Sequence, residues 1–228
     1  IATRKLIDSS KINNGNFSFK YKFTKNEPNF IILRTDSVTL GTLLIEKNEN
    51  INYSGDLKRP SNYTIQGSKG SELVKRLNSD LAVITAKLDS IDRVFKKADG
   101  TDGFDTISQK LQREMTSAIV KHKQSLVRFI AQNPKSFASF TALYQRLPGD
   151  ISVFGLEKDM LYYKILLDSL STDYPNSHYV QILRDDYERI EKSVNLQNML
   201  DNAEIADGIP DIELTDKSGN KTKLSSLR

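Results

Sequence analysis

The most informative absence is cysteine, which does not occur among the 228 residues of the chain. Disulfide bonds, thiolate zinc sites and cysteine nucleophiles are therefore excluded within it. Histidine is almost absent as well, with only His122 and His178 present. No glycine-rich nucleotide loop, serine-hydrolase motif or zinc-protease motif occurs. We therefore predict no catalytic, cofactor-binding or metal-ligating residue in this chain, and no cofactor.

Long apolar runs are also missing. No stretch of about 18 apolar residues occurs, so no segment is predicted to span a membrane. Apolar residues at 38% and charged residues at 27% are typical of a globular chain rather than a disordered one. Because the chain begins at Ile1 rather than at a methionine, we expect a removed signal peptide or lipid-anchor segment. Membrane attachment is expected only through that segment.

The positive charge is modest and unevenly distributed. The net charge is +4, and residues 1–70 hold 11 lysines and arginines against 6 acidic residues. These basic residues are scattered, and no cluster among them is longer than Lys58-Arg59. Binding of nucleic acid requires a concentrated basic stripe, usually with aromatic stacking positions. No nucleic-acid partner is therefore predicted.

Residues 1–67 are predicted to form an antiparallel β-domain, a sandwich or an open barrel, with part of the domain expected ahead of Ile1. Aromatic residues alternate with polar ones from Phe17 to Phe23, which predicts a half-buried strand. The turn Asn13–Asn16 would join this strand to a partner at residues 8–12. Short apolar runs bounded by turn residues predict four further strands, at Phe30–Arg34, Thr39–Glu46, Ile51–Ser54 and Tyr63–Gln66.

Residues 68–202 are predicted to be helical, with Ser68 or Ser71 capping the first helix. Leucine, isoleucine and phenylalanine recur at steps of three and four from Leu73 to Phe95, which indicates one helix of about 28 residues. A second stripe runs from Ile107 to Ile130, so the two helices should form an antiparallel hairpin. Three shorter helices are expected at about 134–146, with Pro134 in the first turn, 156–171 and 178–202.

The polar residues that suggest chemistry have simpler interpretations as structural groups. His122 falls on an apolar helix stripe, where a hydrogen-bonded core histidine is favoured over a metal ligand. We expect His178 on the surface at a helix start. Four acids near one another are interpreted as side-chain pairs on a solvated helix face rather than as a glycosidase acid pair. They are Asp185, Asp186, Glu188 and Glu191. One of Tyr162 and Tyr163 should be buried and the other exposed. The aromatics at 17–23 favour a sheet core over a ligand-stacking site.

Residues 203–228 are expected to form a linker and the first hairpin of a further domain. Pro210-Asp211 leads into the alternating pair Ile212 and Leu214, and a polar turn and return strand precede Ser225-Ser226-Leu227-Arg228. This segment resembles the opening of the thioredoxin-like thiol-disulfide oxidoreductases of the bacterial envelope and their peroxiredoxin relatives. The segments that precede it resemble, in their order, those of family members that begin with a β-domain and a helical region. These segments are Asp8–Phe19, Tyr63–Leu73 and Tyr174–Ser177.

The resemblance implies that the redox centre, a Cys-x-x-Cys on the next strand, lies beyond Arg228. The parent protein would then reduce disulfide-containing proteins in the periplasm or cell envelope, with a lipid anchor as one means of attachment. The present chain would be its accessory region, which positions a substrate or partner or forms a homodimer through the helical hairpin. The alternative is a non-enzymatic envelope module that binds a peptide or glycan.

Overall fold

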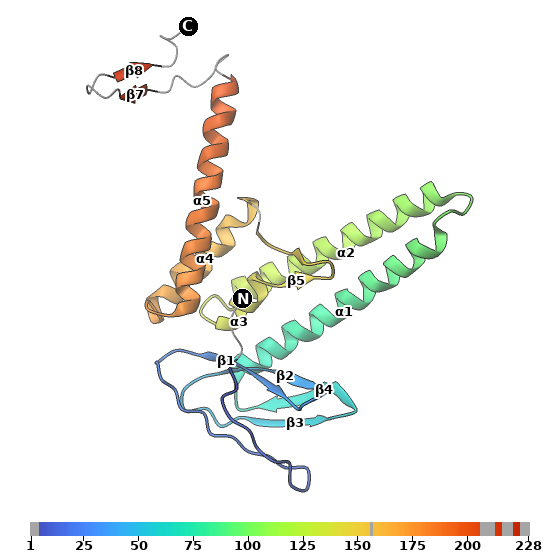
Figure 1. Cartoon of the computed structure of the whole chain (residues 1–228), viewed down its shortest axis with the longest axis vertical. Helices are drawn as coiled ribbons and strands as arrows, with labels where there is room; N and C mark the ends of the chain where they lie inside the picture. The colour runs from blue at the N-terminus through green and yellow to red at the C-terminus, as the bar shows by residue number, and fades with distance from the viewer. Residues whose placement is uncertain (1–4, 156, 206–212, 216–220, 224–228) are drawn as a thin grey trace. The chain divides into compact units, whose positions relative to one another are not determined.

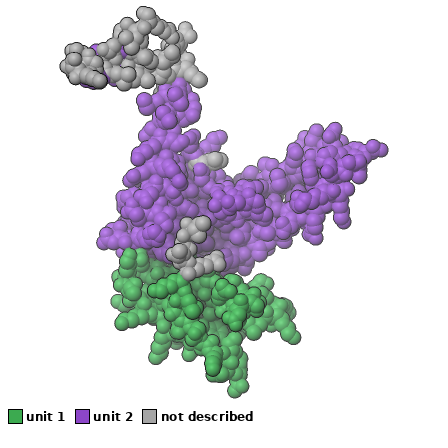
Figure 2. All heavy atoms as spheres, viewed as in Figure 1, with its two compact units in different colours: residues 1–71 green, residues 72–228 purple. Residues whose placement is uncertain are grey.

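The computed structural model describes residues 5–155, 157–205, 213–215 and 221–223, and it has the predicted α+β fold (Figure 1). The chain divides into two compact units, residues 1–71 and residues 72–228 (Figure 2). The described strands of unit 1 lie ahead of Gly67, and the first long helix begins at Lys69. The change from period-2 to helical patterning in the sequence therefore coincides with the change of element type.

Unit 1 contains two antiparallel strand pairs. Strand β1 (Asn29–Arg34) pairs with β2 (Thr39–Ile45), and β3 (Asn52–Asp56) pairs with β4 (Arg59–Gln66). Strands β2 and β4 also contact each other. The four strand segments predicted between residues 30 and 66 are thus confirmed, with small changes at their ends. Closure of these pairs into a sandwich or an open barrel stays a prediction. The buried apolar side chains of this unit are Leu33, Leu40, Leu44, Ile45, Tyr63 and Ile65.

The predicted strand pair at residues 8–12 and 17–23 is wrong. Asn13 and Asn16 exchange two backbone hydrogen bonds of 2.9 Å, with Asn14 and Gly15 at positive φ, so the predicted turn forms. The arms on either side of it have no strand ladder. Phe17 instead packs its ring 6.3 Å from that of Tyr53 on β3. Phe17 therefore has a packing partner on β3 without backbone pairing, whereas Phe19 of the same alternation is exposed.

The junction between β4 and the first helix is fixed by two serine hydroxyls. Ser68 Oγ accepts the backbone N–H of Ser71 at 3.2 Å, which makes Ser68 the helix cap. The backbone N–H of Leu44 donates to Ser71 Oγ at 3.0 Å, and that hydroxyl donates to the Leu44 carbonyl at 2.9 Å. Both serines are buried. Both backbone groups of Leu44 are thus satisfied by one side chain.

Helices α1 (Lys69–Ala98) and α2 (Phe104–Gln132) form the predicted hairpin and run side by side in opposite directions (Figure 1). Lys87 pairs with Glu114 at 3.5 Å, and the rings of Phe95 and Phe104 lie 5.3 Å apart. The buried positions of α1 include Leu77, Ile84, Ile91 and Ala98, which are seven residues apart. This is the spacing of a coiled-coil seam.

The helix predicted at 134–146 is shorter than expected. Helix α3 spans Phe137–Leu143, and Ser136 caps it by accepting the Ala138 N–H at 3.2 Å. Pro134 lies in the turn before it, so the prediction of Pro134 in the first helical turn is wrong. Arg146, expected at the end of this helix, belongs instead to a short strand pair, β5 (Arg146–Leu147) with β6 (Ile151–Ser152). Asp150, at positive φ, lies in the turn between them.

The remaining helices are η1 (Glu157–Asp159), α4 (Met160–Asp173) and α5 (His178–Ile205). They confirm the two helices predicted after residue 155, with shifted ends. Strands β7 (Glu213–Thr215) and β8 (Lys221–Lys223) pair antiparallel, as expected for a hairpin, while the predicted turn at 216–219 lies outside the described residues. In the described part of the chain, no helix combines the length and apolar character needed to cross a bilayer.

Candidate functional site

His122 is a buried structural residue, as its position on the apolar stripe predicts. Its ring is 7% exposed, and Nε2 lies 2.6 Å from Oε1 of the buried Gln145. The Gln145 amide nitrogen lies 3.4 Å from the carbonyl of Leu77. The imidazole and Gln145, which lies two residues after α3, therefore help to join α1 and α2. Such a hydrogen-bonded core histidine has no free position for a ligand at Nε2.

The second histidine and the predicted acids lie on α5. His178 is exposed at its first position. Asp185 accepts a hydrogen bond from Gln181 at 2.7 Å, and Glu191 accepts one from Tyr187 at 3.0 Å. These contacts confirm the interpretation as side-chain pairing along a helix face. Within the described ranges, no three histidine or acidic side chains are grouped so that they could hold a metal ion.

Asp186 is the exception, because its main partner comes from another helix. The hydroxyl of Tyr144 donates to Oδ2 of Asp186 at 2.5 Å, and Arg189 donates to Oδ1 at 2.6 Å. Both carboxylate oxygens are therefore engaged. Tyr144 follows α3 directly, and its ring lies 6.0 Å from that of the buried Tyr163 on α4. The carboxylate thus joins α5 to the residue after α3, and the Tyr144 ring extends the contact to α4.

A second carboxylate, Asp159, lies next to this group. Its side chain is 3% exposed, and its two oxygens lie 2.6 and 2.8 Å from Nζ of Lys123 on α2. The same ammonium group lies 5.2 Å from the ring centre of Phe154, close enough for a cation–π contact. We call Tyr144, Tyr163, Asp159 and Asp186 the tyrosine–aspartate network. Tyr163 and Asp159 are buried, and Tyr144 and Asp186 are half-buried.

Burial and nearby negative charge keep both tyrosines of the network protonated. Burial is the main cause that raises the pKa of Tyr144, and its hydrogen bond to Asp186 adds to this effect. Burial and the charges of Asp186 and Asp159 raise the pKa of Tyr163 to about 12. A phenol in this state donates hydrogen bonds but does not act as a base near neutral pH. Since both carboxylates are also paired, the network is suited to holding helices together and not to proton transfer.

A hollow of about 450 Å³ adjoins the network. The hydroxyl of Tyr163 lies close to Gly155, which lines this hollow. Ser193 donates a hydrogen bond to Glu157 at 2.9 Å across its rim. We call this region the α5 hollow, and its lining residues are Gly155, Glu157, Lys158, Arg189, Ile190 and Ser193. The lining includes two cationic side chains, one carboxylate and one isoleucine, and the two cations could contact a small anionic group.

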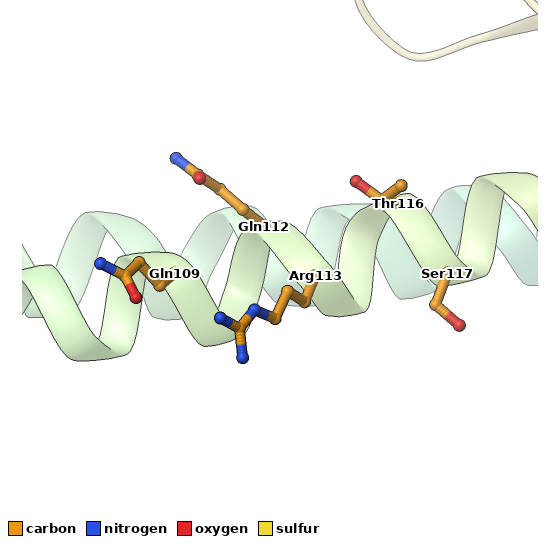
Figure 3. A pocket seen from close by; sticks show the side chains of 5 residues that line it. All are labelled: Gln109, Gln112, Arg113, Thr116 and Ser117. Carbon is orange, nitrogen blue, oxygen red and sulfur yellow. The ribbon is translucent and has the colours of Figure 1, made fainter.

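A second hollow, of about 530 Å³, lies on the outer face of α2. Figure 3 shows that the five side chains around it all come from this one helix, with Gln112 and Thr116 on one side and Arg113 and Ser117 on the other. Residues 112–117 are exposed throughout. The side chains do not converge on a common point, so this hollow is a polar helix face and not a built site.

One segment of the chain resembles a known family. Residues 2–74 match a domain of unknown function (DUF4369). The DUF4369 match covers about a third of the chain and includes β1–β4 and the first residues of α1. No thioredoxin-like family is matched. No curated protein matches the chain, and no solved structure does. The tyrosine–aspartate network and the α5 hollow lie outside the DUF4369 segment.

Sequence patterns gave little indication of this network. Asp159 and Lys123 are 36 residues apart in the chain, and Tyr144 and Asp186 are 42 apart. Asp185-Asp186 is conspicuous as a pair, yet only the second residue has a partner from outside its own helix. The one available signal was an acid at position 159 immediately before an apolar helix, which also fits an ordinary exposed helix start.

Proposed function

We propose that this chain is the accessory region of an envelope thiol-disulfide oxidoreductase. The region would position a disulfide-containing protein substrate or pair two copies of the enzyme. The observation that supports this role is the antiparallel pairing of Glu213–Thr215 with Lys221–Lys223. This pair occupies the place where the sequence resembles the first hairpin of the thioredoxin-like reductases. The DUF4369 segment and five helices precede it in the order that this resemblance implies.

In this proposal the chain contributes no redox group, because it contains no cysteine. The electrons would pass through a low-pKa cysteine of a Cys-x-x-Cys beyond Arg228, which attacks a substrate disulfide and forms a mixed disulfide. The second cysteine would then release the reduced substrate. The proposal places this reaction in the periplasm or cell envelope, with a lipid anchor ahead of Ile1 as one means of attachment.

The coding sequence after Arg228 provides the first test. We expect a Cys-x-x-Cys on the strand that follows β8, and its absence would end the proposal. In the intact parent, deletion of residues 5–205 should then raise KM for a disulfide-bonded protein. The same deletion should leave the reduction of a small disulfide unchanged. Equal loss with both substrates would show that the region does not position protein substrates.

The α1–α2 hairpin is the proposed surface for a second copy. Val83 and Val94 on α1 are 72% and 46% exposed, and their separation of eleven residues places them on one helix face. Ile107, Met115 and Val120 on α2 are also exposed. Apolar side chains that recur along one face of an exposed helix are typical of an interaction surface. A second copy of the hairpin would cover them.

Sedimentation velocity over a range of concentrations tests this pairing. The double variant Val83→Glu/Val94→Glu should shift the chain from dimer to monomer. Leu161→Glu on α4 is the matched control, because it replaces another exposed apolar side chain outside the hairpin. A wild-type chain that stays monomeric at all concentrations would exclude the homodimer.

The alternative function, a module that binds a peptide or glycan, is favoured by one observation. The α5 hollow is lined by the cationic side chains of Lys158 and Arg189, and such groups suit a carboxylate-bearing peptide. A panel of acidic peptides and glycans should then raise the melting temperature of the chain, and Arg189→Gln should remove the shift. Absence of any shift, together with reductase activity of the parent, would exclude this alternative.

A further inference from the structure

The loop around Asn13–Asn16 exposes apolar and basic side chains side by side. In Figure 1 the dark blue N-terminal trace runs away from the strand pairs of unit 1, turns and comes back. On one arm of this loop Lys11 and Ile12 are neighbours, and on the other arm Phe19 and Lys20 are neighbours. Ile12 is 48% exposed and Phe19 is 43% exposed. We call residues 8–22 the N-terminal loop.

The apolar exposure extends toward the N-terminus. Leu6 is 81% exposed and Ile7 is 55% exposed, although both belong to residue types that folded proteins usually bury. Neither lies in a helix or strand. Exposed apolar side chains that gather along one segment mark a contact surface more often than isolated ones do. The segment from residue 5 to residue 20 therefore has apolar side chains available to a partner.

The charge of the same segment identifies the kind of partner. Residues 5–25 contain five lysines, Lys5, Lys11, Lys20, Lys22 and Lys25, against the single acid Asp8. All five lysines are exposed, and none forms an ion pair with any residue that the structure describes. Exposed lysines beside exposed apolar groups are complementary to a partner that is both negative and apolar.

We propose that the N-terminal loop binds the surface of an anionic phospholipid bilayer. Ile12, Phe19 and the apolar pair Leu6-Ile7 would enter the boundary between headgroups and acyl chains, while the lysines contact the phosphates. Lysine suits this position because its aliphatic stem can lie along apolar surface with the ammonium in water. The tight turn, closed by the two Asn13–Asn16 hydrogen bonds, holds the two arms together at the tip. This attachment is independent of the proposed redox role and of any lipid anchor.

An acidic protein is the competing partner, and the observations favour the bilayer. An acidic strand would pair with the free backbone of the loop arms and would not need Leu6 or Ile12. A bilayer uses the exposed apolar side chains and the lysines together. Binding to a bilayer should therefore depend on Ile12 and Phe19, whereas binding to an acidic protein should not. Substitution of these two residues distinguishes the two partners.

The test is co-sedimentation of the chain with large vesicles. We expect binding to vesicles of equal parts phosphatidylcholine and phosphatidylglycerol, and none to vesicles of phosphatidylcholine alone. Binding should weaken as the salt concentration rises, because the lysine–phosphate attraction is screened. Each lysine near an anionic surface changes the affinity by roughly fivefold. The variant Lys11→Gln/Lys20→Gln/Lys22→Gln should therefore bind roughly a hundredfold more weakly.

Two further variants complete the test. Lys47→Gln/Lys58→Gln removes exposed lysines from other loops of unit 1 and should change the affinity much less than the loop variant. Ile12→Ser/Phe19→Ser should weaken vesicle binding by roughly tenfold for each side chain. All of these positions are exposed, so the melting temperature of each variant should stay near that of the wild type.

Three results would overturn the proposal. The first is equal binding to neutral and anionic vesicles. The second is an equal loss of affinity in the two lysine variants, which would show a nonspecific charge effect. The third is tight binding of soluble polyglutamate that survives Ile12→Ser/Phe19→Ser, which would assign the loop to an acidic protein.

Discussion

The hydroxyl of Tyr144 lies 2.5 Å from Oδ2 of Asp186, and this contact joins the end of α3 to the middle of α5. It is a hydrogen bond to a charged, half-buried acceptor, a type that stabilises a fold more than a neutral bond does. The ring of the same tyrosine packs against Phe140 and Tyr163. Tyr144 thus links these helices both by apolar packing of its ring and by a hydrogen bond from its hydroxyl.

Removal of this hydroxyl should destabilise the chain. We expect Tyr144→Phe to lower the free energy of unfolding in urea by about 1.5–3 kcal/mol, because the Asp186 carboxylate loses a donor. Tyr162→Phe is the matched control, since the Tyr162 hydroxyl has no hydrogen bond with a described residue, and it should change stability by less than about 0.5 kcal/mol. Equal effects of the two substitutions would contradict the importance of the Tyr144–Asp186 bond.

Stability should depend on pH in the alkaline range. The pKa of Tyr163 is raised from its ordinary value of 10.0 to about 12, so the folded state binds the phenolic proton more tightly than the unfolded state. The resulting stabilisation is fully present below pH 10 and is lost as the pH rises toward 12. Tyr144 adds to the same trend, because its pKa is also raised.

Tyrosinate absorbance and urea unfolding, both measured against pH, check this expectation. Asp186→Asn should lower the titration midpoint of Tyr163 toward 10, because one of the negative charges that raise it is gone. The fall in stability above pH 10 should then be less steep. Titration of all tyrosines near pH 10 in the native wild type would contradict the buried network.

The Lys123–Asp159 pair should contribute far more than an exposed ion pair. Lys123→Met leaves Asp159, at 3% exposure, without its counter-charge, and we expect a loss of about 3 kcal/mol in urea unfolding. Lys135→Met breaks a pair with Asp173 that is exposed on both sides and measures 4.0 Å, and it should cost less than about 1 kcal/mol. A similar small cost for both would mean that Asp159 is better solvated than the structure indicates.

Two glycines with the same backbone conformation should respond differently to substitution. Gly67 and Gly100 have φ values of +87° and +75°. A Cβ on Gly100 meets open space, whereas one on Gly67 clashes with the backbone carbonyl of Asn50. Gly100→Ala should therefore cost only the about 1–2 kcal/mol of left-handed backbone. Gly67→Ala should cost clearly more and lower the melting temperature of unit 1, and equal costs would contradict this packing.

Local sequence patterns predicted the helices and turns that depend on residues close to one another in the chain. The apolar steps from Leu73 to Phe95 were sufficient to predict α1, because one apolar stripe over about six turns has no alternative to a helix. Asn14 and Gly15 were sufficient for the turn, because both tolerate positive φ. Periodicity failed at Phe17–Phe23, where Phe17 packs against Tyr53 and the backbone pairs with no strand. It failed again at Pro134, where the Ser136 hydroxyl capped the helix two residues later.

The α+β class, the two long helices and the core position of His122 could be predicted from the amino-acid sequence, and the lack of cysteine excludes thiol chemistry within the chain. These properties depend on residue type and on spacings of two to four positions. The contacts of Asp159 with Lys123, of Asp186 with Tyr144 and of two serines with the backbone of Leu44 are visible only in the folded chain. Such contacts join residues separated by 24 to 42 positions. Their formation depends on how helices and strands pack, and no local pattern carries that information.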